Sequence, residues 1–299
     1  MERISFHDQI QTNKLKSFFL ILVIFMFFIF LGYIISLAID PSYFFFVMII
    51  STIFSLSYVL ISYYNSHKIA LASVHAKAAS KIEHRTFFHA VESMSIASGL
   101  PMPKLYVMES DEINAFASGR NPKNAIICVT TGALNKLNKQ ELEGVIAHEM
   151  SHIANYDIRF MTATAILVGM ISIIAQVFLR NLWFSSGSKR EGRAGAVLLI
   201  IAILAAIFAP IAAQLVSFAI SRKREFTADA TGVKFTRYPP GLANALKKIK
   251  NEHISESEKH RAPAALAPLF ISDPFKKKIS GLFATHPDIN QRITILEKM

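Results

Sequence analysis

The chain has 299 residues, of which 52% are hydrophobic and 18% charged, and its formal net charge is +11. Soluble domains usually carry about 25% charged residues, so the composition disfavours an ordinary soluble enzyme and a disordered chain. Cys128 is the single cysteine and has no partner for an internal bridge, which disfavours a secreted disulfide scaffold.

Two uncharged apolar runs open the chain, at residues 17–39 and 43–64. Each is long enough to cross a hydrocarbon core about 30 Å thick as a helix that rises about 1.5 Å per residue. A cleaved signal peptide is a poorer interpretation, because its apolar core has only about 7–15 residues. Residues 1–64 are therefore predicted to form an N-terminal membrane hairpin.

The polar segment that follows, residues 65–159, is predicted to contain a helix at 77–98 and strands at 105–108 and 126–130. Both strands are short β-rich runs bounded by turn-forming residues. Asn138, with Glu141 three residues later, matches a capping box, so another helix is expected to begin there. On that helix, Gly144 is expected to leave room for a substrate or a water molecule.

The same helix carries the sequence His148-Glu149-Met150-Ser151-His152. Histidines four residues apart lie one above the other on a helix, so both imidazoles can bind one metal ion. Glu149 is rotated off the histidine line and can reach a metal-bound water without taking a coordination position. The alternative is a pair of surface histidines, but the capped and amphipathic helix favours the metal site.

Two further uncharged runs, at 160–179 and 194–220, predict a second membrane hairpin over residues 160–220. Their small residues suit close contact between helices in a membrane. The loop at 180–193 carries four basic residues, which conflicts with a position on the far side of the membrane. Either the preference of basic residues for the cytoplasmic side of a membrane is overridden here, or the hairpin does not fully cross the membrane or lies buried in a protein core.

The last segment, residues 221–299, is predicted to complete the domain begun by 65–159. Glu225 and Asp229 are four residues apart and share one helix face. One carboxylate can bind the metal while the other accepts a hydrogen bond from a ligand histidine. The alternative is a surface ion pair with Arg224. Asp157 either supports a histidine in the same way or caps the next helix.

The positive charge lies mainly after the last apolar run, since residues 220–299 carry +7 of the +11. Basic residues beside membrane spans indicate the cytoplasmic side and contact with anionic lipid. Four spans place both polar segments on that same side. No recognition motif for nucleic acid accompanies the charge, so nucleic acid is not an expected partner.

Four stretches, in order, give the chain a resemblance to a known family. They are Asn-Ala-Phe-Ala at 114–117, the motif at 148–152, Glu-Phe-Thr-Ala-Asp at 225–229, and Thr-His-Pro at 285–287 with Arg292 after it. Together with the paired apolar runs, they resemble the HtpX family of bacterial membrane-bound zinc metalloproteases, which is related to the CAAX prenyl proteases. The resemblance covers nearly the whole chain. It implies a multi-pass α-helical membrane protein with a cytoplasmic α+β zincin-like (gluzincin) metalloprotease domain.

The resemblance also implies a set of site residues. One zinc ion per chain would be bound by His148, His152 and Glu225, with Glu149 as the general base. Asp229 would be the hydrogen-bond partner of a ligand histidine.

Two C-terminal residues and one short segment have less specific implied roles. His286 would donate a hydrogen bond to the developing oxyanion, or else cap a helix before Pro287, and Arg292 would help to hold the C-terminal element. Asn114, Ala115 and Phe116 are expected just before an edge strand at 126–130, along which a substrate would pair as an extra strand.

The implied activity is zinc-dependent endopeptidase action at the cytoplasmic face of the cell membrane. The expected partners are the lipid bilayer and membrane-protein or unfolded polypeptide substrates, in the quality control of damaged or misfolded membrane proteins. A non-catalytic relic is disfavoured by the intact Glu149, and an intramembrane protease by the charges just before the motif. A prenyl-protein protease would need more spans. Residues 255–278 form either a mobile flap or an ordinary loop, and the oligomeric state is left open.

Overall fold

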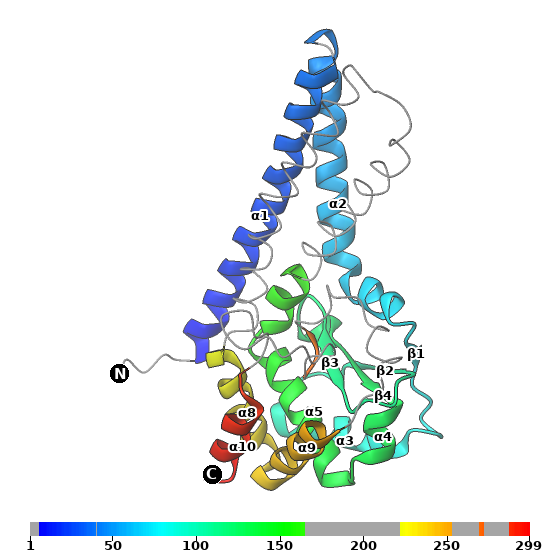
Figure 1. Cartoon of the computed structure of the whole chain (residues 1–299), viewed down its shortest axis with the longest axis vertical. Helices are drawn as coiled ribbons and strands as arrows, with labels where there is room; N and C mark the ends of the chain where they lie inside the picture. The colour runs from blue at the N-terminus through cyan, green and yellow to red at the C-terminus, as the bar shows by residue number, and fades with distance from the viewer. Residues whose placement is uncertain (1–5, 40, 165–221, 253–268, 272–286) are drawn as a thin grey trace.

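The computed structural model describes residues 6–39, 41–164, 222–252, 269–271 and 287–299. Two long helices extend from one side of a domain that holds a small sheet and the other helices (Figure 1). The labelled elements in chain order are α1 (Phe6–Ile39), η1 (Pro41–Tyr43), α2 (Phe44–Ser73), β1 (Lys77–Ala78), α3 (Arg85–Ser98), β2 (Lys104–Met108), β3 (Ala115–Ser118), η2 (Pro122–Asn124), β4 (Ile126–Thr130), α4 (Thr131–Lys136), α5 (Lys139–Ala154), α8 (Arg222–Thr236), α9 (Pro239–Asn251) and α10 (Ile289–Leu296).

The helices α1 and α2 pack against each other as an antiparallel hairpin (Figure 1). Both are long and apolar enough to cross a membrane, over Ile10–Phe30 and Phe44–Ser73. Phe45 and Ile53 of α2 keep their side chains exposed, and an exposed apolar surface of this kind is typical of contact with lipid. The helices cover the runs predicted at 17–39 and 43–64 and continue beyond them toward the domain. The second predicted hairpin, beyond residue 164, lies outside the described residues.

The sheet has the strand order β1-β2-β4-β3, and its strands β3 and β4 are buried on both faces. β2 and β4 run parallel, whereas β1 and β3 are antiparallel to their neighbours. Side chains of β4 alternate between the faces, as the pleat requires. Ile127 and Val129 join the core formed with α3, α5 and α9, and Ile126 and Cys128 face the end of α2 and residues 269–271. Burial raises the pKa of the Cys128 thiol, as expected of an apolar strand position.

Two sequence predictions about this sheet need correction. The strands at 105–108 and 126–130 are confirmed, but β4 lies between β2 and β3 and is not an edge strand. The edge strand next to β4 is β3, whose four residues include no β-branched residue and so give a weak strand signal in the sequence. The helix predicted at 77–98 begins only at Arg85. Residues 77 and 78 pair with β2 instead, so tertiary pairing overrides the helix propensity of this lysine- and alanine-rich stretch.

Helix α5 begins as predicted, with a complete capping box between Asn138 and Glu141. The role expected for Gly144 is wrong. A Cβ atom there would lie 2.5 Å from the backbone nitrogen of Leu242, so α9 fills the space that was assigned to a substrate or water. The missing side chain therefore lets α5 and α9 approach backbone to backbone, which fixes the helix that carries the two histidines.

We expect Gly144→Ala to destabilise the domain, because an added methyl group must push α9 away from α5. Overpacking of this kind costs about 1–3 kcal/mol. Thermal unfolding of the purified chain in detergent measures the effect as a lowered midpoint. The control is Gln140→Ala, an exposed position on the same helix, which should leave the midpoint unchanged. An unchanged midpoint for Gly144→Ala would show that the two helices separate freely.

Candidate metal and catalytic site

His148 and His152 lie one turn apart on α5 and are both buried. Their Nε2 atoms are 3.2 Å apart, and the ring planes meet at 89°. The spacing of the motif therefore directs both Nε2 atoms to one point inside the domain, as the sequence predicted. A pair of surface histidines is excluded by their burial.

The third member of the cluster is Glu225 in the first turn of α8. Its carboxylate oxygens lie 3.6 Å from the Nε2 atoms of His148 and of His152. The helices can come this close because α8 presents Gly232 to α5, where a Cβ atom would be 3.1 Å from the backbone nitrogen of His148. One ligand atom from each of the three residues lies within 4.8 Å of the others, so the cluster can hold a metal ion.

Each histidine is held from behind by a carboxylate. Nδ1 of His148 lies 2.9 Å from Oδ1 of Asp229, and Nδ1 of His152 lies 3.1 Å from Oδ2 of Asp157. Such contacts fix the ring orientation and leave Nε2 free to bind a metal. Two nitrogen donors and one carboxylate, with both histidines oriented in this way, fit the donor set of a three-ligand zinc site. Of the alternatives for Asp157, the structure favours support of a histidine.

Two buried arginines balance these carboxylates. From α10, Arg292 donates to both oxygens of Asp229, at 2.8 and 2.7 Å, and its Nη1 is 3.4 Å from Glu225. The Nε atom of Arg224 lies 3.1 Å from Asp157. The alternative of a surface ion pair for Arg224 is not supported, because its side chain is buried and its Nε atom faces Asp157.

These contacts shift the pKa values of the site. Burial opposes the charged form of His148, but hydrogen bonds to Asp229 and Glu225 outweigh it and raise the pKa of His148 to about 9. Burial likewise acts against the charge of Asp229, yet Arg292 and His148 together lower the pKa of its carboxyl. Arg292 has a raised pKa, since the nearby carboxylates outweigh its burial.

Glu149 is buried beside the cluster, with 1% of its surface exposed. Burial is the largest influence and raises the pKa of its carboxyl, although the two histidines and a backbone hydrogen bond from Ala117 act in the opposite direction. The structure thus links the carboxyl group to the edge strand β3. A carboxyl group with a raised pKa is suited to accept and return a proton near neutral pH.

Comparison with known proteins identifies the family. The family model for peptidase family M48 matches residues 82–299. The chain belongs to peptidase family M48. It is 46% identical over 256 residues to the protease HtpX homolog of Caldanaerobacter subterraneus subsp. tengcongensis, covering 84% of each chain. The protease HtpX homolog of Dictyoglomus thermophilum is 39% identical over 299 residues, covering 100% of this chain and 96% of that one. A crystal structure of S. mikatae Ste24p aligns at 18% identity with a TM-score of 0.46, over 95% of this chain and 65% of that one.

The family match and the two HtpX homologues confirm the resemblance to HtpX, and together with the two apolar helices they support a membrane metallopeptidase. Of the predicted site residues, the structure brings together His148, His152, Glu225, Glu149, Asp229, Asp157 and Arg292. The predicted oxyanion donor, His286, lies outside the described residues. So does most of the segment at 255–278 that was expected to be a flap or a loop.

The predicted substrate segment of this M48 protein lies at the sheet edge, with Ala115 and Phe116 inside β3 and Asn114 just before it. Part of that edge is already occupied. The backbone nitrogen of Ile271 donates to the carbonyl of Ala115 at 3.0 Å, and Phe270 bridges to Phe116. A substrate that pairs with β3 must therefore use the part of the edge nearer Ala117, or displace residues 269–271.

A residue that the sequence analysis missed connects α1 to the histidines. Asn13 is buried, and its amide nitrogen donates to Oδ1 of Asp157 at 2.7 Å and to the carbonyl of Asn155 at 3.0 Å. The partner carboxylate lies 144 residues away in the sequence, so no local pattern signals this contact. The first apolar helix thus contributes to the support of His152.

We expect Asn13→Ala to weaken metal binding at the cluster by about tenfold, because Asp157 loses a hydrogen bond that holds it against His152. Changes in such outer contacts typically cost 10–100-fold in metal affinity. Competition with a zinc chelator measures the affinity of the full chain. The neighbouring exposed Thr12→Ala serves as the control. Equal affinities for Asn13→Ala and the wild type would show that α1 does not influence the site.

Proposed function

We propose that this M48 protein is a membrane-anchored zinc endopeptidase with one zinc ion per chain. The observation that carries the proposal is the buried cluster of His148, His152 and Glu225 with the Glu149 carboxyl beside it. Two histidines and one glutamate are a ligand set found in hydrolytic zinc sites, where water or substrate takes the fourth coordination position. When bound, zinc would supply Lewis acidity to the scissile carbonyl and to the attacking water.

The protein's own residues have separate roles in this proposal. Glu149 takes a proton from the attacking water and delivers it to the leaving amine. Asp229 and Asp157 hold the two histidine rings in place, and Arg292 holds Asp229. His286 is proposed as the donor that stabilises the oxyanion, a role that rests on the resemblance of residues 285–287 to the family motif.

The substrates are proposed to be membrane proteins or unfolded polypeptides at the cytoplasmic face. Lys14 and Lys16 on α1 and Lys68 on α2 lie at the domain end of the hairpin, and basic residues in such positions favour the cytoplasmic side. An extended segment would add to the edge strand β3, which selects unfolded chains rather than folded ones. Both features support quality control of damaged or misfolded membrane proteins.

The proposal is tested on the full chain purified in detergent. Elemental analysis should find about one zinc per chain, and an unfolded polypeptide should be cleaved. A strong chelator should abolish cleavage, and added zinc should restore it, whereas magnesium and calcium should not, because they prefer oxygen ligands. A purified chain that contains far less than one zinc ion per molecule would contradict the proposal. Cleavage that survives complete removal of zinc would contradict it as well.

A further inference from the structure

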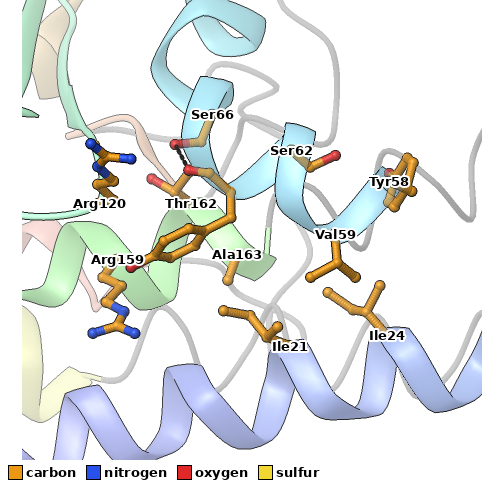
Figure 2. Close-up of a pocket in the computed structure, with 12 residues that line it drawn as sticks. Ile21, Ile24, Tyr58, Val59, Ser62, Ser66, Arg120, Arg159, Thr162 and Ala163 are labelled. Carbon is orange, nitrogen blue, oxygen red and sulfur yellow. Dashed lines mark hydrogen bonds between the residues drawn. The ribbon is translucent and has the colours of Figure 1, made fainter. Parts of the chain in front are cut away.

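We propose that the pocket between the apolar hairpin and the M48 domain binds one anionic phospholipid, with its phosphate at two arginines and its acyl chains along α1 and α2. The pocket lies beside the site described above and shares none of the cluster's residues. Figure 2 shows its lining side chains between α1 and α2, with Arg159, Thr162 and Ala163 contributed by the segment that follows α5. It is lined by Ile21, Ile24, Tyr58, Val59, Ser62, Tyr63, Ser66, Gly119, Arg120, Arg159, Thr162 and Ala163.

One wall of the pocket is apolar. Ile21 and Ile24 extend from α1, and Val59 faces them from α2 (Figure 2). The wall continues into the outer surface of the hairpin, where Leu22 and Val23 are exposed. Burial of hydrocarbon against such a surface is favourable, so a hydrocarbon chain is the ligand that this wall fits.

The other end of the pocket carries two guanidinium groups, Arg120 and Arg159, which lie on the same side in Figure 2. Each stands over a tyrosine ring of α2, at 4.5 Å from the centroid of Tyr64 and 5.4 Å from that of Tyr63. Among the described residues neither arginine has an ion pair with a carboxylate, and the buried Nε atom of Arg159 has no hydrogen-bond partner. A buried donor without an acceptor is costly, and a phosphate oxygen would satisfy it.

The combination of an apolar wall with two arginines indicates a lipid rather than a free anion. Arginine matches phosphate with paired N–H donors, which accounts for the polar end. The apolar wall accounts for the rest only when the ligand also has acyl chains. Ser62, Ser66 and Thr162 add hydroxyl groups to the lining of the pocket. Arg120 and Arg159 belong to the domain, so the polar end of the pocket lies on the domain side of the hairpin, where basic residues favour an anionic leaflet.

A lipid bound here would contact segments that lead directly to the proposed active site. Gly119 and Arg120 follow the edge strand β3, and the hydroxyl of Thr162 lies 3.2 Å from that of Ser118, the last residue of β3. Arg159 comes two residues after Asp157, which holds His152. We therefore expect anionic lipid to increase proteolysis. This consequence rests on the proposed function, whereas lipid binding itself does not.

Native mass spectrometry of the full chain in detergent tests the binding. The probes are dioctanoyl phosphatidylglycerol, dioctanoyl phosphatidylcholine and inorganic phosphate. We expect one phosphatidylglycerol per chain, several-fold weaker binding of phosphatidylcholine, and no retention of phosphate. The double variant Arg120→Gln/Arg159→Gln should bind phosphatidylglycerol at least about tenfold more weakly, because charge-assisted hydrogen bonds are lost. Arg120→Lys/Arg159→Lys should be intermediate.

The matched control is Arg85→Gln/Lys123→Gln, which removes the same charge from exposed positions of the domain. It should bind phosphatidylglycerol like the wild type. Equal binding by the pocket variant and the control would overturn the proposal, and so would phosphate retained as tightly as the lipid, or phosphatidylcholine bound as tightly as phosphatidylglycerol. Cleavage in vesicles with and without phosphatidylglycerol is measured separately. A chain that binds the lipid but cleaves nothing would contradict the proposed function alone.

Discussion

The variant Glu149→Gln should keep one zinc ion per chain and cleave an unfolded polypeptide about 10²–10⁴-fold more slowly than the wild type. The amide has the shape of the carboxylate but cannot take a proton from water, and general-base catalysis contributes about that factor. The zinc content should not change, because the proposed ligands are His148, His152 and Glu225. Zinc analysis and cleavage rates on the same preparations measure both effects.

The control for this variant is Glu143→Gln, which makes the same chemical change at a partly exposed position of α5. It should cleave at the wild-type rate. Cleavage by Glu149→Gln at the original rate would overturn the general-base role. Loss of zinc together with loss of cleavage would mean instead that Glu149 helps to hold the metal.

Sequence periodicity was sufficient for the part of the site that lies on one helix. The capping box and the four-residue spacing of His148 and His152 are local, so α5 and its histidines could be predicted in detail. Which of Glu225 and Asp229 faces the histidines depends on how α8 is rotated against α5. Spacing alone could not decide that, and the structure places Glu225 at the cluster and Asp229 behind His148.

Two features that could not be predicted depend on packing between elements that are far apart in the sequence. Asn13 reaches Asp157 only because α1 packs beside the end of α5. The space next to Gly144 is occupied by α9 and not by solvent. In both cases the deciding neighbour is an element far away in the sequence. The sheet edge was misplaced for a different reason. β4 has the stronger strand signal, but the weaker strand β3 pairs outside it and becomes the edge.

The variant Arg292→Met should lower the stability of the zinc-depleted protein by about 3–5 kcal/mol, the usual cost of removing one partner of a buried ion pair. Arg292 is 2% exposed and donates to both oxygens of Asp229, so methionine fills the space but removes the guanidinium and both of its hydrogen bonds from that carboxylate. The unfolding midpoint in chelator should fall by roughly 10 °C, given about 2–4 °C per kcal/mol for a domain of this size.

Added zinc should raise that midpoint more in Arg292→Met than in the wild type. A bound dication stabilises only the folded state, and it also supplies positive charge next to Glu225 and His148, where the guanidinium is missing. Arg292→Lys should restore part of the stability, since it returns the charge without the two parallel hydrogen bonds. Lys298→Met removes the same charge from an exposed position just after α10 and should change neither midpoint. An Arg292→Met protein as stable as this control would show that Asp229 does not depend on Arg292 for its charge balance.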